Sequence, residues 1–328
     1  MKDLVQPVRF AKSEPVADGY EDPCGDPCGV VGGTVGGVAR ALARGRRRAG
    51  QRTAGNKSGA IQHPGAYFRF FLHTLHFIDE RNQAITDFET NRIDRLHGNT
   101  FDAHRVLHLA PPPSTGTTDP RTTALVQALS RRSRPSALVY GSTSGVYGDC
   151  AGAWVDENRS VNPITPRAQR RVNAEARVRH LGRLRAGAVR VSVLRIPGIY
   201  APDREGGTPR ERLLRGTPVL AREDDVFTNH IHADDLARAC QLALWRGQPQ
   251  RVYNVNDDSQ LLMGDYFDMA AGLYGLAKPP RISRAQAQTE LPAMQLSFMS
   301  ESRRMMNTRM KRELRLQLRY TDTQSGLV

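Results

Sequence analysis

The chain has 328 residues, of which 39% are hydrophobic and 6% aromatic, enough for one large α/β domain with a smaller lobe or for two ordinary domains. No apolar run approaches roughly 18 residues and the first residues lack a signal-like apolar stretch, so we expect a cytoplasmic protein without a membrane partner. The net charge of +14 raises nucleic acid as a partner, but the basic residues are spread along the chain without a nucleic-acid-binding motif, which argues against specific binding.

Cysteine spacing bears on metal binding. The chain has four cysteines, and Cys24 and Cys28 form a C-x-x-x-C pair. A zinc site would require two more ligands at comparable spacing, and none lies nearby. Cys150 and Cys240 are far apart in the sequence. We therefore predict no bound metal and ordinary reduced thiols.

Residues 1–28 are interrupted by prolines and predict an irregular segment. Residues 29–37 are rich in glycine and run into residues 38–43, which are good helix formers with an apolar face. A glycine-rich turn that opens a helix can bring backbone N–H groups to a pyrophosphate. The candidate cofactor-binding residues of this turn are Gly32, Gly33 and Gly36. Val31 stands where G-x-G-x-x-G requires its first glycine, so a flexible glycine-rich linker is an open alternative.

Residues 46–100 mix aromatic residues and histidines without a regular pattern. They predict no clear succession of strands and helices, and an altered or degenerate reading frame in this stretch is one interpretation.

From residue 102 onward, short apolar runs alternate with helical patterns. The runs predict strands at residues 106–110, 137–140, 189–195 and 251–255. The segments between them predict helices at residues 119–131, 166–184 and 234–245. This alternation indicates βαβ units and a Rossmann-type, doubly wound α/β fold with a parallel sheet. Ligands of such sheets bind at the carboxyl ends of the strands, where the sequence places Ala110, Pro111, Ser142 and Pro197.

Four blocks in this part of the chain resemble those of the extended short-chain dehydrogenase/reductases, the NAD-dependent epimerase/dehydratase-like proteins. They lie in the family's order at residues 141–148 (Gly-Ser-Thr-Ser-Gly-Val-Tyr-Gly), 194–202, 229–235 and 253–255. The resemblance covers roughly residues 103–260. It implies an NAD(P)-binding domain over residues 29–257, followed by a small helical lobe over residues 258–328 on the substrate side of the cleft.

The family's catalytic residues are matched only in part. The Ser/Thr position of the family corresponds to Thr143, four residues before Tyr147. The resemblance places Arg167 at the family's catalytic Tyr and Arg171 at its Lys. Tyr serves the family as the proton-transfer group, whereas Arg stays protonated and is a poor general base. The resemblance therefore points to an atypical member with an altered catalytic set, or to a non-catalytic dinucleotide-sensing or scaffold protein.

Other side chains near the expected cleft have structural interpretations. Tyr147 and Tyr200 occupy positions where the family has Tyr beside its catalytic one, so we interpret both as structural. His230 and His232 come just before a predicted helix, which favours a capping role over a proton shuttle.

The cofactor is expected to be NADP or NAD. An acidic residue about 20 positions after the glycine-rich turn would indicate NAD, and none lies between Gly37 and Ile78. Arginines including Arg52 lie there instead, which favours the 2′-phosphate of NADP and makes Arg52 a candidate cofactor-binding residue. The other partner expected is a small-molecule substrate. The oligomeric state is left open, a homodimer included.

Overall fold

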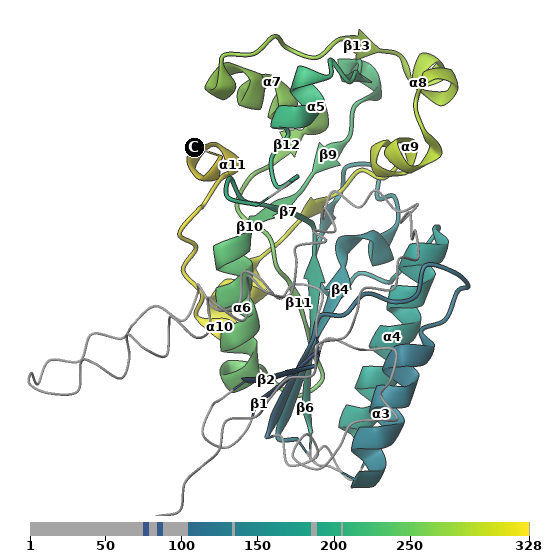
Figure 1. Ribbon diagram of the computed structural model, residues 1–328, viewed down its shortest axis with the longest axis vertical. Coiled ribbons are helices and arrows are strands. Elements are labelled where there is room, and N and C mark those ends of the chain that lie inside the picture. The colour runs from purple at the N-terminus through teal and green to yellow at the C-terminus, as the bar shows by residue number, and fades with distance from the viewer. Residues whose placement is uncertain are drawn as a thin grey trace, which may run out of the picture.

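The computed structural model describes residues 75–78, 84–87, 104–132, 135–184, 189–204 and 206–327. A six-stranded sheet in the order β11-β6-β4-β3-β1-β2 forms its centre (Figure 1). The strands are β1 (Leu75–Ile78), β2 (Ala84–Asp87), β3 (Arg105–His108), β4 (Ala137–Thr143), β6 (Arg190–Ile196) and β11 (Arg251–Asn254).

The sheet is parallel from β3 through β4 and β6 to β11. β1 and β2 form an antiparallel hairpin, and β1 also runs antiparallel to β3. The sheet is therefore mixed, whereas the sequence predicts a parallel one. Both hairpin strands lie within residues 46–100, where no elements are predicted. β1 (LHFI) and β2 (AITD) mix polar and apolar residues over only four positions, so neither stands out from the irregular sequence around it.

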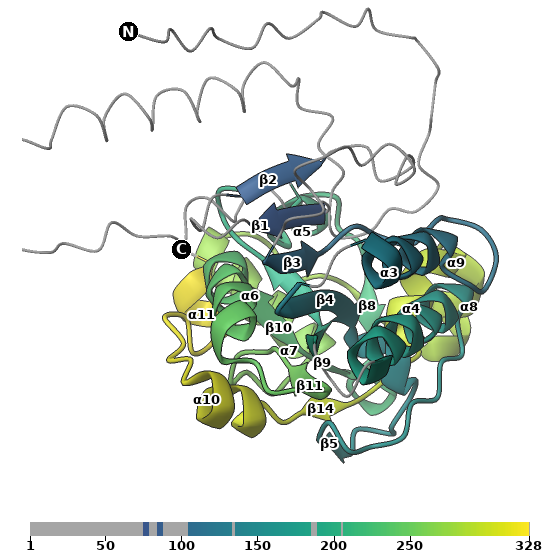
Figure 2. The ribbon, with the colours of Figure 1, turned by 90° about the horizontal axis from the view of Figure 1, so that it is seen from below.

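Helices cover both faces of the sheet (Figures 1 and 2). α3 (Pro120–Arg132) and α4 (Pro166–Arg183) pack together on one face. α6 (Ala233–Arg246) and α10 (Thr308–Leu314) lie on the other. This double-sided cover confirms the doubly wound α/β class predicted from the sequence. It also explains why the parallel strands are continuous apolar runs, because both of their faces are buried.

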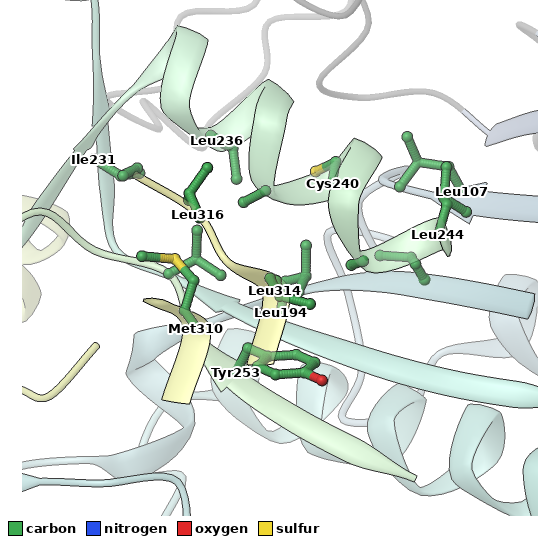
Figure 3. Close-up of a cluster of buried hydrophobic side chains, with 14 of the residues drawn as sticks. Leu107, Leu194, Ile231, Leu236, Cys240, Leu244, Tyr253, Met310, Leu314 and Leu316 are labelled. Carbon is green, nitrogen blue, oxygen red and sulfur yellow. The ribbon is translucent and has the colours of Figure 1, made fainter. Parts of the chain in front are cut away.

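Alternate strand residues divide between two cores. On β3, Val106 packs under α3 and α4, whereas Leu107 packs under α6. Leu194 of β6 and Tyr253 of β11 join Leu107, and Met310 of α10 closes this second core (Figure 3). Fully burying one such side chain stabilises the fold by about 1.5–3 kcal/mol.

Local capping fixes where the covering helices begin. α4 begins at Pro166 after Thr165, whose hydroxyl accepts a hydrogen bond from the backbone N–H of Ala168. α6 begins after His232, whose Nδ1 accepts from the N–H of Asp234 at 3.1 Å. The capping role predicted from the sequence is thus confirmed for His232.

A second group of elements lies above the carboxyl ends of the parallel strands (Figure 1). Its helices are α5 (Arg210–Leu214), α7 (Met263–Tyr274), α8 (Arg284–Glu290), α9 (Ala293–Met299) and α11 (Thr323–Gly326). Short strand pairs brace them: β7 (Gly198–Tyr200) with β10 (His230–His232), β8 (Val219–Leu220) with β13 (Arg281–Ile282), β9 (Phe227–Thr228) with β12 (Leu261–Leu262), and β5 (Trp154–Val155) with β14 (Arg304–Met305). We call this group the upper lobe.

The upper lobe has a core of its own, built from two separate stretches of chain. Leu213, Val219 and Val226 of the first stretch pack with Phe267 and Met299 of the second. α10 then returns to the sheet beneath α6. The division of the chain at residue 257 stays a prediction.

The described residues also bear on membrane association, metal binding and the state of the cysteines. Within the described ranges, no helix combines the length and apolar character required to cross a membrane. Among the same residues, no three His, Cys, Asp or Glu side chains come together as metal ligands. Cys150 and Cys240 are buried free thiols, whereas Cys24 and Cys28 lie outside the described residues.

Candidate functional site

A cavity of about 690 Å³ lies between the strand ends and the upper lobe. Its floor comes from residues that follow β3, β4 and β6, and its roof from α5, α7 and α9. The carboxyl ends of parallel strands are where open α/β sheets bind their ligands, so this cavity is the candidate site.

Most of the site residues predicted from the sequence meet here. The predicted residues that line the cavity are Pro111, Ser142, Thr143, Arg167, Arg171 and Pro197. Ala110 is buried, 1% exposed, and does not line the cavity. Gly32, Gly33, Gly36 and Arg52 lie outside the described residues. The roles of all these residues remain predictions.

Thr143 ends β4 at the cavity floor. Its Oγ1 accepts a hydrogen bond from the N–H of Gly145 at 3.3 Å and caps the short helix η3 (Ser144–Tyr147). Ser142, one residue earlier, points to the other face of the strand and donates to Glu175 Oε1 at 2.6 Å. The strand alternation therefore separates the half-buried Thr143 side chain from the buried Ser142 hydroxyl, which is already hydrogen-bonded.

The two arginines on α4 point to different partners. Arg171 Nη1 donates to the carbonyl of Gly141 at 2.8 Å and to the Tyr140 hydroxyl at 3.2 Å. The guanidinium of Arg167 lies 4.7 Å from the ring centre of Phe298 on α9, a cation–π contact between the sheet domain and the upper lobe. Arg171, predicted to stand at the family's Lys position, thus contacts the end of β4, and Arg167, predicted to stand at its Tyr position, reaches the roof.

A buried ionic network lies beneath the floor. Glu175 on α4 accepts hydrogen bonds from Arg195 on β6 and from Ser142. The Arg195 guanidinium lies 4.6 Å from the ring centre of Tyr147, and the Tyr147 hydroxyl donates to Asn254 Oδ1 at 2.7 Å. The network links β4, α4, β6, η3 and β11, so it fixes the strand ends that form the floor.

The alternative proton-transfer tyrosines are bound elsewhere. Burial raises the pKa of Tyr147 to about 12, and this residue does not line the cavity. Tyr200 lines the cavity, but its hydroxyl donates to the carbonyl of Asp322 at 3.1 Å, and burial raises its pKa as well. Both contacts agree with the structural interpretation made from the sequence.

His230 differs from its neighbour His232. It lines the cavity and stacks on Tyr266 of α7, with ring centres 4.3 Å apart. Burial lowers the pKa of His230 to about 4, so the imidazole is neutral at physiological pH. The capping role expected of this histidine belongs to His232 alone.

The upper lobe contributes polar residues that the sequence did not predict. Glu301 and Arg303 line the cavity, and Arg303 donates two hydrogen bonds to Glu301 Oε2, at 2.9 and 2.8 Å. A Cβ atom on Gly145 would lie 3.8 Å from Glu301 Oε2 and 3.8 Å from Thr143 Oγ1. The two side chains therefore face the same small space. Arg212 of α5 also lines the cavity. These residues follow no motif, because only the packing of the lobe on the sheet brings them to the cavity.

The sequence and fold are similar to those of known proteins. The family model described as "NAD dependent epimerase/dehydratase family" matches residues 115–256. A solved structure of a functionally unknown conserved protein from Silicibacter pomeroyi is 32% identical, with a TM-score of 0.60 over 71% of this chain and 78% of that one. No curated protein matches the sequence.

More distant structures share the fold. UDP-glucuronic acid 4-epimerase from Bacillus cereus, in complex with NAD, is 18% identical with a TM-score of 0.54 over 69% of this chain and 72% of that one. RMD from Pseudomonas aeruginosa, complexed with NADPH, is 16% identical with a TM-score of 0.56 over 86% of this chain and 92% of that one. Together with the strand-end cavity, the family model and the 32% identical relative show that this chain belongs to the NAD-dependent epimerase/dehydratase family.

Proposed function

We propose that this chain binds NAD(P) and acts on a small or nucleotide-linked substrate with an altered catalytic set. The observation that carries the proposal is the cavity in which Thr143, Arg167 and Arg171 meet at the strand ends, beneath the upper lobe. The neighbours crystallised with NAD or NADPH support it through their shared fold.

The described residues fit one end of a dinucleotide better than the other. The nicotinamide and its ribose would fit at the strand ends, which carry Pro111, Ser142 and Pro197. Arg171 would serve there as a hydrogen-bond donor. The pyrophosphate would be held by a glycine-rich turn, and the candidate glycines lie outside the described residues. β1 runs antiparallel to β3, with Leu75 beside His108. It is therefore not the parallel strand that would precede such a turn. A bound NAD(P) would supply hydride transfer to or from the substrate.

Glu301 is our candidate for the missing proton-transfer group. Neither Arg167 nor Arg171 can take a proton at physiological pH. Glu301 faces the same space as Thr143, and its two hydrogen bonds from Arg303 fix the direction of the carboxylate. A substrate hydroxyl that accepts or donates a hydrogen bond at Thr143 would then lie within reach of a carboxylate base.

The first experiment is a calorimetric titration of the purified full-length chain with NADPH and with NADH, at two salt concentrations. We expect saturable binding, with NADPH the tighter ligand. Comparable affinities would remove the preference for NADP. Absence of binding to both would overturn the proposed function and would place the defect in the first part of the chain, because the described cavity is otherwise complete at its floor.

The second experiment separates the catalytic residues. A screen of sugar nucleotides and small carbonyl compounds would follow NADPH absorbance with the wild type, with Glu301→Gln and with Arg167→Tyr/Arg171→Lys. We expect Glu301→Gln to lower kcat by about a hundredfold or more, the usual contribution of a general base, while leaving NADPH affinity unchanged. The arginine replacements restore the family's pair and are expected to raise turnover. A wild-type rate unaffected by Glu301→Gln would exclude the carboxylate as the base.

A non-catalytic sensing or scaffold role is the alternative. The specific observations that favour it are the arginines at both positions of the family's catalytic pair and the antiparallel β1 beside β3. Saturable NADPH binding without turnover by either the wild type or the Arg167→Tyr/Arg171→Lys variant would support this alternative.

A further inference from the structure

Arg212 is a cavity residue with an uncompensated charge. It lies on α5, which packs against α7 in the upper lobe, and its guanidinium stacks 4.4 Å from the ring centre of Phe267. Within the described part of the chain no carboxylate forms an ion pair with it, and its Nη2 atom is buried without a hydrogen-bond partner. The side chain is therefore held in place by a ring, not by a counter-charge.

The acidic residues of the cavity are already paired with other arginines. Glu301 binds Arg303 at 2.8 Å, and Glu211 lies 3.9 Å from Arg215 on the solvent-exposed side of α5. The charged side chain that acts on the pKa of Arg212 is Arg215, which has the same sign. Burial lowers the pKa of Arg212 to about 10; the Tyr266 hydroxyl acts in the opposite direction, and Arg215 adds a smaller lowering effect. The group therefore still carries its charge at neutral pH.

A desolvated cation without a partner is unfavourable unless a ligand supplies the opposite charge. The guanidinium is planar and presents paired N–H donors whose geometry matches carboxylate and phosphate groups. Stacking on Phe267 fixes the plane of these donors and reduces the ordering that a ligand must impose.

We propose that Arg212 binds an anionic group of the substrate, a carboxylate or a phosphate, at the upper-lobe side of the cavity. The inference rests on the proposed function only in identifying the cavity as the substrate cleft. It places the anion on the roof, opposite the floor at Thr143, so the two contacts would orient a substrate across the cavity.

The test uses calorimetry on the full-length protein at about 150 mM salt, where non-specific attraction to a basic protein is largely screened. Uridine diphosphate and inorganic phosphate probe a phosphate group, and succinate probes a carboxylate. Each is titrated with and without saturating NADPH. Tighter binding of the phosphate probes would identify phosphate as the group recognised, and tighter binding of succinate would identify carboxylate.

The variants are Arg212→Met and a matched control, Arg210→Met, which removes an exposed arginine from the same helix. Losing a charge-assisted hydrogen bond should weaken binding by about ten- to a hundredfold in Arg212→Met, with Arg210→Met unchanged. Arg212→Lys keeps the charge without the planar donors and should fall between wild type and Arg212→Met. It also serves as the test variant if circular dichroism shows that Arg212→Met does not fold.

Two results would overturn the inference: no probe binds, or both Arg212 variants bind as tightly as the wild type. An equal loss in Arg210→Met would also do so, because it would indicate non-specific attraction. NADPH binding without anion binding removes this subsite and leaves the proposed function standing. Anion binding that depends on Arg212, without binding of either dinucleotide, removes the proposed function and leaves the subsite.

Discussion

Arg195 on β6 and Glu175 on α4 form a buried ion pair directly beneath the cavity floor. Arg195 donates to both carboxylate oxygens, at 3.2 and 2.8 Å, and the side chains are only 5% and 6% exposed. Ser142 donates to the same carboxylate. The pair therefore fixes the helix that carries Arg167 and Arg171 against the strand that ends at Thr143.

Removing one partner of this pair should strongly destabilise the fold. Arg195→Met would leave the Glu175 carboxylate buried without its counter-charge, which typically costs about 3–5 kcal/mol. Urea denaturation would measure the loss. The control is Arg215→Met, whose pair with Glu211 is exposed and should contribute less than about 1 kcal/mol. Equal losses in the two variants would contradict the role assigned to the buried pair.

The turn after η3 should tolerate no side chain at Gly148. This residue has a φ of +65°, and a Cβ there would overlap the carbonyl oxygen of Asn162. Gly148→Ala should therefore cost roughly 3 kcal/mol or more. Gly216 has a similar φ of +62° but no atom within 4 Å of the Cβ position, so Gly216→Ala should cost only about 1–2 kcal/mol. Thermal unfolding of the two variants measures the difference, and similar melting temperatures would show that the turn relaxes.

Stability should depend on pH through Asp257. Burial, with smaller effects of Asp258 and Asp322, raises the pKa of Asp257 to about 8, and its Oδ2 has no hydrogen-bond partner. Between about pH 4 and pH 8 the folded protein holds a proton that the unfolded chain has lost, so this group's contribution to stability falls as pH rises through that window.

Asp257→Asn isolates this effect. The quantity compared is the free energy of unfolding of the wild type minus that of the variant. We expect this difference to fall by on the order of 3 kcal/mol from pH 5 to pH 8. His108 and His230, whose pKa values burial lowers to about 4, act in the opposite direction below about pH 6.5. Both histidines are present in both proteins, so their effects cancel in the difference. Urea denaturation at three pH values gives the measurement, and a constant difference would contradict the raised pKa.

The two arginines of the altered catalytic set should differ in their structural cost. Arg171→Met would leave the buried Tyr140 hydroxyl and the Gly141 carbonyl without their donor, a loss of about 1–3 kcal/mol. Arg167→Met would remove the cation–π contact with Phe298, which is worth about 1 kcal/mol. Chemical denaturation would rank the variants, and a larger loss for Arg167→Met would show that the α9 contact is the stronger one.

The parallel part of the fold could be predicted from the sequence because its signals are local. The strand predicted at residues 189–195 is β6 (Arg190–Ile196), and the helix predicted at residues 234–245 is α6 (Ala233–Arg246). Strands buried on both faces are continuous apolar runs, and amphipathic helices separate them. β1 and β2 gave no such signal, because each mixes polar and apolar residues over four positions within an irregular stretch.

The floor of the candidate site could also be predicted, because motif spacing brought Thr143 on β4 and the two arginines on α4 to the strand ends. The roof could not. Glu301 lies 158 residues after Thr143 in the sequence, and no spacing rule connects them.

By itself, the sequence determined the doubly wound α/β class and the strand ends that form the cavity floor, whereas the assignment of Arg167 and Arg171 to the family's catalytic positions stays a prediction. Each of these depends on residues close together along the chain, through strand and helix periodicity or motif spacing. Only the tertiary structure decided which charges face the cavity and which are neutralised. It pairs Glu175 with Arg195 and Glu301 with Arg303, and it leaves Arg212 stacked on Phe267. Charge pairing depends on distance and burial in space, and these are set when the upper lobe packs on the sheet.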